Sequence, residues 1–518
     1  MSYIYNLGLK FKEISCKYSE KAAIKFCDGS SISFYGLDRL SDKIANLLII
    51  KGLKKNQVVA IQNEKTPFGY AAMLACIKIG VIYTNFDPNN PKERLNKIFE
   101  CAKPSIVISD KKLSGQVAEI CSEKSIEIFD YSHTYARSEI EQQNEILSDE
   151  ILKGVIGFDP VYIMFTSGST GIPKGVLIKQ ESVLNFIEWG KITYNITPDD
   201  TLTNVNPIYF DNSVFDFYCS IFNGASLAAF PKEIIEKPKE MLEIIDKTGC
   251  TFWFSVPSFL IYLNNIKLLS KETFKNIRAF SFGGEGYPKD LLLKFYNLYK
   301  ERAEFFNVYG PTEGTCICSA YKVSESDFEN MTGLVTLGYI APNFDYLILD
   351  DNNVPSNKGE LCLLGSQLAS GYYNDKERTN KSFVNNPLNT CFEQRMYKTG
   401  DLVELKNDGK LYFIGRADNQ IKHMGYRIEL EEIEAGLIKI LYIKQCAVVH
   451  GKTNNGFSRI VAYIATDEKI DQKQLRDDLK KFLPDYMIPN LFELMDELPK
   501  NANGKVDRVF LKQKSGLI

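Results

Sequence analysis

Short apolar runs rich in β-branched and aromatic residues alternate with amphipathic stretches along most of this chain. The runs begin at Val58 (VVAIQ), Ser105 (SIVIS), Val161 (VYIMF) and Phe252 (FWFSV), and the stretch LLLKFYNLY at 291–299 has the spacing of an amphipathic helix. Such alternation is typical of parallel strands joined by helices, and it predicts the α/β class. In open sheets of this class, ligands bind beyond the carboxyl ends of the strands. We therefore expect a binding site where these runs end.

The loop at 165–176, which follows one of these runs, reads FTSGSTGIPKGV. Its hydroxyl groups, its backbone N–H groups and its lysine are chemically suited to a polyphosphate. A Walker loop has a glycine directly before its lysine, because the backbone wraps a phosphate there. Pro173 precedes Lys174 in this loop, and this excludes the Walker class. From these residues alone, an ordinary glycine- and serine-rich surface loop remains an open alternative.

The bulk composition narrows the class of protein. The chain has 518 residues, of which 44% are hydrophobic, and this length predicts more than one domain. The net charge is −3 with both signs spread along the sequence, which argues against a nucleic-acid-binding protein. The start has no sustained apolar segment after a basic end, and the most apolar stretch, 71–83, is broken by Lys78 and too short to span a bilayer. We expect a cytoplasmic protein without membrane insertion.

Cysteine and histidine usage argues against metal and disulfide chemistry. Twelve cysteines are scattered without a C-x-x-C pair, which fits reduced, mostly buried thiols. The three histidines, His133, His423 and His450, are not spaced as metal ligands, and no G-x-S-x-G elbow occurs. Zinc catalysis and histidine-based hydrolysis are therefore poorly supported. We interpret His423 as a solvated loop residue, although a functional role for it stays open.

The sequence changes character after about Gly415. A charge-rich helix-like stretch, two strand-like runs and a polar helix follow one another: IELEEIEAGLIK, QCAVVH, RIVAYIA and the segment from Gln472. A compact α+β unit of roughly a hundred residues fits this order. We place the boundary near Asp418, which predicts a large N-terminal domain at 1–417 and a small C-terminal domain at 418–518.

Nine motifs follow one another along the chain, and the number after each is that of its first residue. They are FDPNNPKERL (86), FTSGSTGIPKGV (165), FDNSVFDFY (210), FGGEGYP (282), NVYGPTEGT (307), YKTGDLVE (397), FIGRADNQIKHMGYRIELEEIE (413), LPDYMIP (483) and LPKNANGKVDR (498). Together they resemble the amino-acid-adenylating branch of the acyl- and aryl-adenylate-forming (AMP-binding) enzymes, over nearly the whole chain. Within that branch, FSVPSFL, FGGE and the length are most similar to stand-alone D-alanine–carrier protein ligases, and the motifs also resemble nonribosomal peptide synthetase adenylation domains.

The resemblance implies a fold and a reaction. The fold is α/β, with a large N-terminal domain of helix-covered, mostly parallel sheets, a small β-barrel-like part, and a small mobile α+β C-terminal domain. In the reaction, ATP with Mg²⁺ and a carboxylic acid give an acyl-adenylate and pyrophosphate, and a pantetheine thiol then takes the acyl group as a thioester. Attack on the α-phosphate builds charge on phosphate oxygens, which donors and a metal must stabilise.

The same resemblance assigns the nucleotide contacts. The loop is expected to cover the β- and γ-phosphates through Thr166, Ser167, Gly168, Ser169, Thr170, Gly171 and Lys174. Tyr309 is expected to stack on adenine, with Asn307 at the edge of the base. Thr312 would donate to the α-phosphate as a catalytic residue, and Glu313 would hold magnesium. A plain β-turn around Gly310 is the alternative interpretation there. The remaining expected contacts are Gly284, Glu285, Val308, Gly310, Pro311, Phe413 and Gly415.

Four charged residues complete the nucleotide site. Asp401 is expected to bind both ribose hydroxyls, because one carboxylate accepts two hydrogen bonds, and Arg416 to lie against ribose and phosphate. Asp418 aligns with the family's hinge, about which the small domain turns. Lys505, in NGKVDR, matches the family's catalytic lysine, whose ammonium would align the substrate carboxylate with the α-phosphate. Without the resemblance, the acids and the lysine would be interpreted as ordinary solvated charges.

The activated acid is expected to be an amino acid, because Asp211 matches the family position that pairs with a substrate ammonium. The other pocket positions carried over from the family are Asn212, Phe215, Phe254, Ser281, Gly283, Val308, Cys316 and Ile317. This mostly apolar set resembles pockets for small to medium, branched aliphatic amino acids. D-Alanine ligases usually carry cysteine where Gly283 stands, so we expect a side chain larger than methyl, with valine and isoleucine both accepted.

Two other functions stay open. An acyl-CoA synthetase or a luciferase-like oxidase of the same fold would act on an acid without an amino group. A catalytically inactive binding module would be expected to lack Lys505, Glu313 or Asp401, yet all three are present. The chain ends soon after the lysine motif without a carrier domain, so we expect a separate carrier protein with a phosphopantetheine arm as partner.

Overall fold

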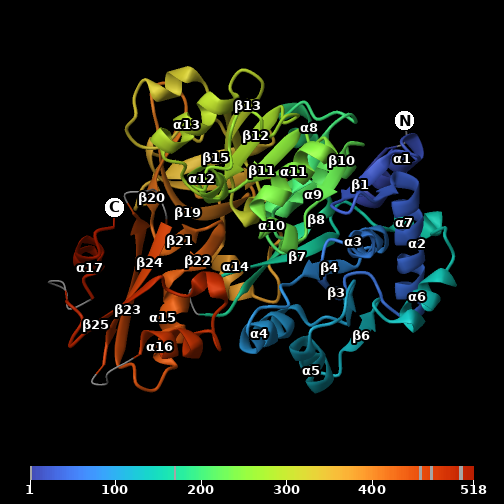
Figure 1. Cartoon of the computed structure of the whole chain (residues 1–518), viewed down its shortest axis with the longest axis horizontal. Helices are drawn as coiled ribbons and strands as arrows, with labels where there is room; N and C mark the ends of the chain where they lie inside the picture. Colours follow the sequence, from blue (N-terminus) through green and yellow to red (C-terminus); the bar gives the residue numbers. More distant parts are fainter. Residues whose placement is uncertain (1–2, 169–170, 454–457, 467–470, 501–505, 518) are drawn as a thin grey trace.

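One layer of the fold is a mostly parallel sheet of N-terminal strands (Figure 1). The computed structural model describes residues 3–168, 171–453, 458–466, 471–500 and 506–517. In this sheet every residue of β3, β4 and β5 is buried, as expected for parallel strands covered by helices on both faces. The strand order is β17 (Gly371–Tyr372), β8 (Lys174–Lys179), β7 (Pro160–Thr166), β4 (Ile82–Asn85), β3 (Val58–Gln62), β5 (Ile106–Ser109), β6 (Glu127–Asp130).

A second mostly parallel sheet follows in the chain and is also deeply buried. Its pairs are parallel from β1 through β13, and the edge strands β2 and β14 are antiparallel to their neighbours. The order is β14 (Ser319–Lys322), β13 (Glu304–Tyr309), β12 (Ala279–Gly283), β11 (Phe252–Ser255), β9 (Thr201–Asn204), β10 (Ser226–Ala229), β1 (Ala22–Phe26), β2 (Ser31–Ser33).

Two largely apolar helices, α3 (Pro67–Ile79) and α9 (Asn212–Ile221), join the two sheets into one core. Helix α3 is buried on nearly all sides, which its continuous apolar sequence requires. It begins at Thr66, whose hydroxyl accepts from Gly69 N, and ends at Gly80 in the left-handed conformation. Tyr70 of α3 stacks on Phe217 of α9 at 5.8 Å between ring centres. This contact fixes the start of α9, where Asp211 lies.

The remaining helices of the N-terminal part pack on the central helices or on the outer faces of the sheets (Figure 1). They are α1 (Leu7–Lys17), α2 (Phe34–Ile50), α4 (Lys92–Ala102), α5 (Gly115–Glu123), α6 (Thr134–Glu141), α7 (Asp149–Gly154), α8 (Gln180–Thr193), α10 (Lys232–Ile235), α11 (Pro238–Thr248), α12 (Pro257–Asn265) and α13 (Lys289–Tyr299), with the 3₁₀ turns η1 (Thr312–Gly314) and η2 (Glu325–Phe328). No helix in the described part of the chain combines the length and the apolarity that crossing a bilayer requires.

An antiparallel sheet completes the N-terminal part. Its strands are β15 (Phe344–Leu349), β16 (Lys358–Gly365), β19 (Arg395–Leu405) and β18 (Phe383–Asn385), with β20 (Leu411–Arg416) also paired to β19, and α14 (Lys376–Ser382) precedes β18. Together with the two parallel sheets, this curved sheet confirms the predicted α/β class with its small barrel-like part.

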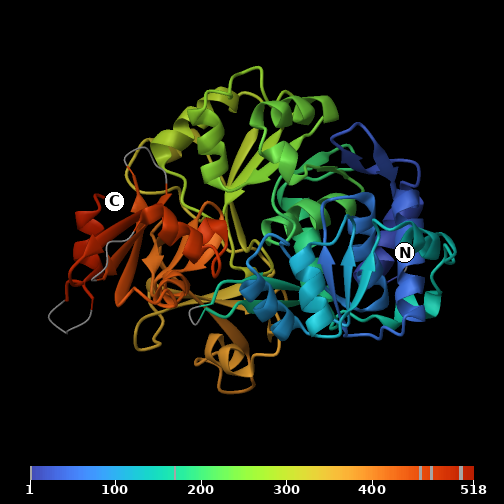
Figure 2. The same ribbon diagram turned by 60° about the horizontal axis from the view of Figure 1, so that its bottom comes forward.

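The C-terminal elements gather at one end of the molecule, opposite the N-terminus (Figures 1 and 2). The hairpin β21 (Gln420–His423) and β22 (Tyr426–Glu429) leads into α15 (Leu430–Ile438). A sheet of β23 (Gln445–Lys452), β24 (Ser458–Ala465) and β25 (Leu491–Met495) packs with α15, α16 (Gln472–Leu479), η3 (Asp485–Met487) and α17 (Arg508–Lys514). This α+β unit was predicted, but the interpretation of His423 as solvated is wrong, because its side chain on β21 is only 3% exposed.

Candidate active site

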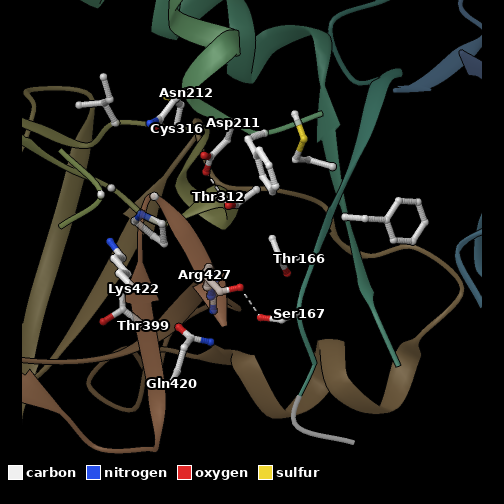
Figure 3. Close-up of a pocket in the computed structure, with 18 of the residues that line it drawn as sticks. Thr166, Ser167, Asp211, Asn212, Thr312, Cys316, Thr399, Gln420, Lys422 and Arg427 are labelled. Carbon is white, nitrogen blue, oxygen red and sulfur yellow. Dashed lines mark hydrogen bonds between the residues drawn. The ribbon is translucent and has the colours of Figure 1, made fainter. Parts of the chain in front are cut away.

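A cavity lies where strands of both large sheets end and the hairpin β21–β22 meets them (Figure 3). The hairpin contributes Gln420, Lys422, Gly425 and Arg427 to its wall. Strands that are distant in sequence therefore bring the predicted residues together, as the carboxyl ends of parallel strands do. Those in the wall are Thr166, Ser167, Asp211, Asn212, Phe254, Gly284, Val308, Gly310, Pro311, Thr312, Cys316, Ile317, Asp401 and Arg416.

The predicted phosphate loop connects β7 to β8, and its ends, Thr166 and Lys174, are paired in register. Thr166 Oγ1 is buried and has no hydrogen-bond partner among the described residues, so this donor is available to a ligand. Gly171 adopts φ 70°, which the loop needs in order to turn back toward β8. Ser169 and Thr170 lie outside the described residues.

Three other donors of this loop are bound by the C-terminal elements. Ser167 Oγ donates to a backbone carbonyl of β22 at 2.6 Å, as Figure 3 shows. The N–H of Gly168 donates to Oε2 of Glu432 at 3.4 Å, and Lys174 Nζ lies 3.2 Å from Oε1 of Glu429. Two carboxylates therefore hold donors that were predicted to bind phosphate.

Glu313, the predicted magnesium ligand, is fully buried in η1. Its oxygens accept from the hydroxyl of Tyr372 and from Nη1 of Arg427, each at 2.7 Å. Burial acts to raise the pKa of this carboxyl, but the charges of Arg427 and Lys174 outweigh it and lower the pKa to about 2. Mg²⁺ is commonly held by one or two carboxylates together with substrate phosphates, so a single glutamate suits magnesium–ATP. Magnesium bound there would compete with Arg427 for this carboxylate.

Asp401, predicted to bind ribose, is also held by protein groups. The hydroxyl of Tyr309 donates to its Oδ2 and Arg416 Nη1 to its Oδ1, both at 2.6 Å. The ammonium of Lys422 lies 5.8 Å from the centre of the Tyr309 ring, which is the ring predicted to stack on adenine. The residues predicted to bind adenosine thus lie together, and their polar groups are satisfied from within the protein.

Asp211 and Thr312 face each other at another part of the wall (Figure 3). Thr312 Oγ1 donates to Oδ2 of Asp211 at 2.5 Å. Burial raises the pKa of the Asp211 carboxyl, and the Thr312 hydrogen bond opposes that shift. The neighbouring apolar wall consists of Phe254, Val308, Cys316 and Ile317. A carboxylate beside an apolar wall can receive a ligand that has both a cation and an alkyl side chain.

The sequence also matches known families. The profile of AMP-binding enzymes matches residues 11–373, and the profile of the AMP-binding enzyme C-terminal domain matches residues 432–505. The chain belongs to the AMP-binding enzyme family. This membership confirms the resemblance that the motifs carried, and it makes the chain an enzyme of the adenylate-forming type.

Curated relatives of this AMP-binding enzyme are nonribosomal peptide synthetases. It is 33% identical over 488 residues to a dimodular nonribosomal peptide synthase of Bacillus subtilis (strain 168), a match that covers 93% of this chain and 20% of that protein. It is 30% identical over 508 residues to zwittermicin A synthase ZmaJ of Bacillus cereus, covering 97% of this chain and 93% of that protein. The chain thus spans 20% of the first relative, and 11% of gramicidin S synthase 2 of Brevibacillus brevis.

Solved structures of adenylation domains have the same fold. The Vibrio cholerae adenylation domain AlmE, in complex with glycyl-adenosine-5'-phosphate, superposes with a TM-score of 0.84 at 21% identity, covering 100% of this chain and 99% of that one. NpsA-ThdA, an artificially fused adenylation–PCP di-domain from Klebsiella oxytoca, gives 0.82 at 23% identity, covering 95% and 94%. At these identities the likeness shows the fold, including its small C-terminal domain.

Three residues predicted to line the substrate pocket lie behind its wall. The Phe215 ring packs edge-on against Phe254, with 5.3 Å between ring centres. Ser281 is fully buried, and its Oγ lies 3.4 Å from a buried tyrosine hydroxyl. A Cβ added to Gly283 would lie 2.5 Å from the carbonyl oxygen of Val308. These residues therefore support the wall of the cavity from outside it.

Other predicted nucleotide contacts also lie away from the wall. Phe413 is 38% exposed on β20, the strand that also carries Gly415. Asn307 Nδ2 donates to the backbone carbonyl of Thr336 at 2.9 Å. Glu285 accepts the N–H of Gly425 at 2.6 Å and so contacts the hairpin tip. Asn307 and Glu285 therefore form hydrogen bonds with backbone groups of the protein itself in this structure.

Sequence reasoning did not assign Arg94, Tyr372, Gln420 or Tyr486 to the site. Arg94 pairs with a carboxylate of α15 and lines the cavity, and the ring of Tyr486 stacks on Tyr426 of the hairpin at 3.8 Å. Gln420 Nε2 donates to a carboxylate at the end of β22 at 2.6 Å. The motifs FDPNNPKERL and LPDYMIP contain Arg94 and Tyr486 and were the available signal. Tyr372, which binds Glu313, lies in no motif.

The predicted hinge, Asp418, lies between β20 and β21. Arg416 donates to both of its carboxylate oxygens, at 2.6 and 2.7 Å, and this ion pair lowers the pKa of the Asp418 carboxyl against the opposing effect of burial. Arg416 therefore bridges the predicted hinge and Asp401 in the cavity. The domain boundary at 417–418 stays a prediction. Lys505 lies outside the described residues.

Proposed function

We propose that this AMP-binding enzyme joins an amino acid to ATP, which forms the aminoacyl-adenylate and releases pyrophosphate. In a second step it passes the aminoacyl group to the phosphopantetheine thiol of a carrier protein. Asp211 carries the proposal. Its carboxylate faces the cavity and, within the described residues, makes a hydrogen bond to Thr312 but no ion pair. The charges of Lys422 and Arg427 favour its ionised form without contacting it, so a substrate ammonium could bind it directly.

The apolar wall supports a branched aliphatic side chain as the substrate class. Phe254, Val308, Cys316 and Ile317 surround the space beside Asp211, and burial raises the pKa of the Cys316 thiol well above its usual value. The thiol therefore acts as a small neutral group. Discrimination between neighbouring aliphatic side chains in such a wall is about 1–3 kcal/mol, so valine and isoleucine would both react.

A second cavity supports transfer to a thiol on a long arm. It adjoins the first cavity, because Arg94, Phe165, Phe210 and Tyr486 line both. An arm reaching through it would bring a thiol toward the cavity that holds Asp211. Two structural neighbours are described as containing adenylation and PCP domains, which supports a carrier protein as the acceptor for this chain as well.

The position of the hairpin β21–β22 fits the second step of the proposed reaction. Arg427 binds Glu313, and Glu429 binds Lys174, so a magnesium-bound triphosphate and the hairpin would compete for the same groups. Magnesium would be held by Glu313 and the phosphates, and would supply charge stabilisation at the reacting phosphate. The first step therefore needs another orientation of the small domain, in which Lys505 reaches the nucleotide.

An amino-acid-dependent ATP–pyrophosphate exchange assay tests the proposal. The panel contains all proteinogenic L-amino acids, several D-amino acids and a series of fatty acids. We expect exchange with branched aliphatic amino acids and none with fatty acids. Exchange driven by fatty acids alone would contradict the proposal and favour an acyl-CoA synthetase of the same fold. Transfer of the activated amino acid to a holo carrier protein then tests the second step.

A further inference from the structure

Two of the three histidines of the chain meet at one serine in the C-terminal unit. His423 Nδ1 lies 2.6 Å from Ser458 Oγ, and His450 Nε2 lies 2.5 Å from the same oxygen. The imidazole ring centres are 5.9 Å apart with an interplanar angle of 87°. This His423–Ser458–His450 cluster is separate from the cavity, and the proposed function leaves it without a role.

The cluster connects two elements that share no backbone ladder. His423 is the last residue of β21 in the hairpin, whereas His450 and Ser458 lie on β23 and β24 of the neighbouring sheet. In the register of β23 and β24, His450 pairs with Ile460 and Ser458 with Lys452, so His450 and Ser458 are diagonal neighbours on one face. The serine hydroxyl therefore links the end of β21 to that sheet.

The two hydrogen bonds limit where the protons of this cluster can lie. A serine hydroxyl has one hydrogen to donate and two lone pairs to accept with, so at least one of the two imidazoles presents an N–H and at most one presents a bare nitrogen. Both imidazoles satisfy this requirement when they are neutral. Burial lowers the pKa of His423 to about 4 and that of His450 to about 3, the latter with help from His423, Lys512 and Lys452. Both rings are therefore neutral near pH 7, and the two hydrogen bonds form together.

The hairpin tip needs such an anchor because its own turn is unfavourable. Met424 and Gly425 form the two-residue connection between β21 and β22, with φ of 51° and 84°. Both central residues of such a turn have positive φ, which Asn-Gly adopts easily and methionine does not. A Cβ added to Gly425 would lie 2.8 Å from Val256, so the tip also packs tightly against the N-terminal part. A small displacement of the tip would therefore disturb its fit in the cavity.

We propose that His423, Ser458 and His450 are positioning residues for the transfer step: they fix the end of β21 to the sheet of the small domain, so that Lys422 and Arg427 enter the cavity in register. The inference rests on the proposed function, in which the hairpin serves thioester formation. Lys422 directly precedes His423, and Arg427 is the cross-strand partner of Lys422 in the hairpin. Loss of the anchor would therefore impair transfer more than adenylation.

Ser458→Ala in the full-length enzyme tests the inference, because it removes both hydrogen bonds and leaves the cavity residues unchanged. Adenylation is measured as valine-dependent pyrophosphate exchange, and transfer as thioester formation from synthetic valyl-adenylate and free pantetheine. We expect exchange within about twofold of the parent and transfer lowered roughly tenfold or more, since small misplacements of reacting groups cost that much. Ser458→Thr, which keeps the hydroxyl, should restore transfer.

Tyr463→Phe is the matched control. Tyr463 lies on the same strand, β24, and its hydroxyl donates to the Leu511 carbonyl at 2.9 Å, away from the hairpin. The variant removes one buried hydrogen bond from the same unit and should leave the ratio of transfer to exchange unchanged. Equal losses in both steps for folded Ser458→Ala, or an equal change of ratio in Tyr463→Phe, would overturn the inference.

Amide hydrogen exchange of the hairpin separates this inference from the proposed function. Exchange of the amides at 420–429 should be faster in Ser458→Ala than in the parent and in Tyr463→Phe, whatever the activity of the enzyme. Unchanged protection at these amides overturns the positioning role even if transfer falls. A parent enzyme that shows neither valine-dependent exchange nor transfer, with the expected change in protection, overturns the proposed function and leaves the anchor established.

Discussion

The two sides of the cavity are built by different means. On the N-terminal side, the functional groups stand at the ends of β7, β11 and β13, inside a continuous apolar core. On the C-terminal side, the hairpin β21–β22 and Tyr486 of η3 reach the cavity, and charged contacts beside it help to hold the hairpin and α15 to the N-terminal part. These are Arg427 with Glu313, Glu429 with Lys174, and Glu432 with Arg94. The N-terminal side of the cavity is therefore fixed by apolar packing. The C-terminal side is held in part by ion pairs, whose partners other charged groups can replace.

This difference explains how one cavity can serve two steps. Side chains in a packed core leave it only when the core unfolds. A guanidinium can instead be replaced by magnesium, and a carboxylate by phosphate, because each replacement has the same sign of charge. The groups that are predicted to recognise adenosine and the amino acid lie mostly on the fixed side. The groups that are proposed to serve only one step lie on the side that turns.

The largest effect is expected from replacing Lys505, which tests whether the small domain serves the two steps with different residues. If the lysine serves adenylation alone, Lys505→Ala should lower pyrophosphate exchange by roughly a hundred- to a thousandfold, as loss of a transition-state donor does. Transfer of a chemically supplied aminoacyl-adenylate to a carrier thiol should be kept. A folded Lys505→Ala enzyme that is equally defective in both steps would refute this division.

Asp418→Pro is the counterpart of that variant. Proline restricts the backbone torsions that a turning hinge needs, so adenylation should be largely kept and transfer lost. Both half-reactions are measured on the same preparations. If Asp418→Pro lowers exchange as strongly as transfer, the small domain does not turn about this residue.

Asp211 tests the fixed side of the cavity. Asp211→Ala should lower kcat/KM for the amino acid roughly 30- to 150-fold, a loss of about 2–3 kcal/mol of transition-state stabilisation, because a desolvated ammonium would lose its partner. Asp211→Asn keeps the shape and should lose nearly as much. Asp345→Ala, at an exposed position of β15, is the control and should leave exchange unchanged. Normal exchange in Asp211→Ala would exclude an amino acid as substrate.

Arg427 tests the exchangeable side. Arg427→Ala removes the cation that covers Glu313, so magnesium–ATP should bind more tightly, with a roughly tenfold lower KM for ATP, while transfer slows. Arg459→Ala, an exposed arginine on β24, should change neither quantity. A higher KM for ATP in Arg427→Ala would show that the arginine assists nucleotide binding instead of competing with it.

The smallest effect is expected from replacing Gly283, which tests whether this residue shapes the substrate pocket on the fixed side. Gly283→Cys is expected to shrink the pocket and shift preference toward alanine-sized substrates. Its Cβ would first meet the Val308 backbone, so the variant should also lose about 1–3 kcal/mol of unfolding free energy. Gly115→Ala, where a Cβ meets nothing within 4 Å, is the stability control. Constant kcat/KM ratios for alanine and valine would show that Gly283 does not shape the pocket.

Much of the fixed side was predictable from local pattern. The apolar run VYIMF predicted a buried strand, and β7 is that strand, with Thr166 at its end in the wall of the cavity. The motifs at Asp211 and Thr312 were assigned to one site, and the two side chains form a hydrogen bond. The side that a residue faces is less predictable: His423 is buried instead of solvated, and Phe215 and Ser281 are buried outside the cavity wall, so their role in substrate binding stays a prediction.

The sequence by itself determined the α/β class, the motifs that bear the site, and the family to which the chain belongs. Each of these depends on local periodicity or on motifs that stay together in the chain. The tertiary structure decided the partners: that Glu313 faces Tyr372 and Arg427, and that Ser458 joins His423 to His450. Periodicity encodes which face of an element is buried, but not which distant element covers it. Contacts between charged and polar groups far apart in sequence depend on how separate cores dock, and that docking has no local signal.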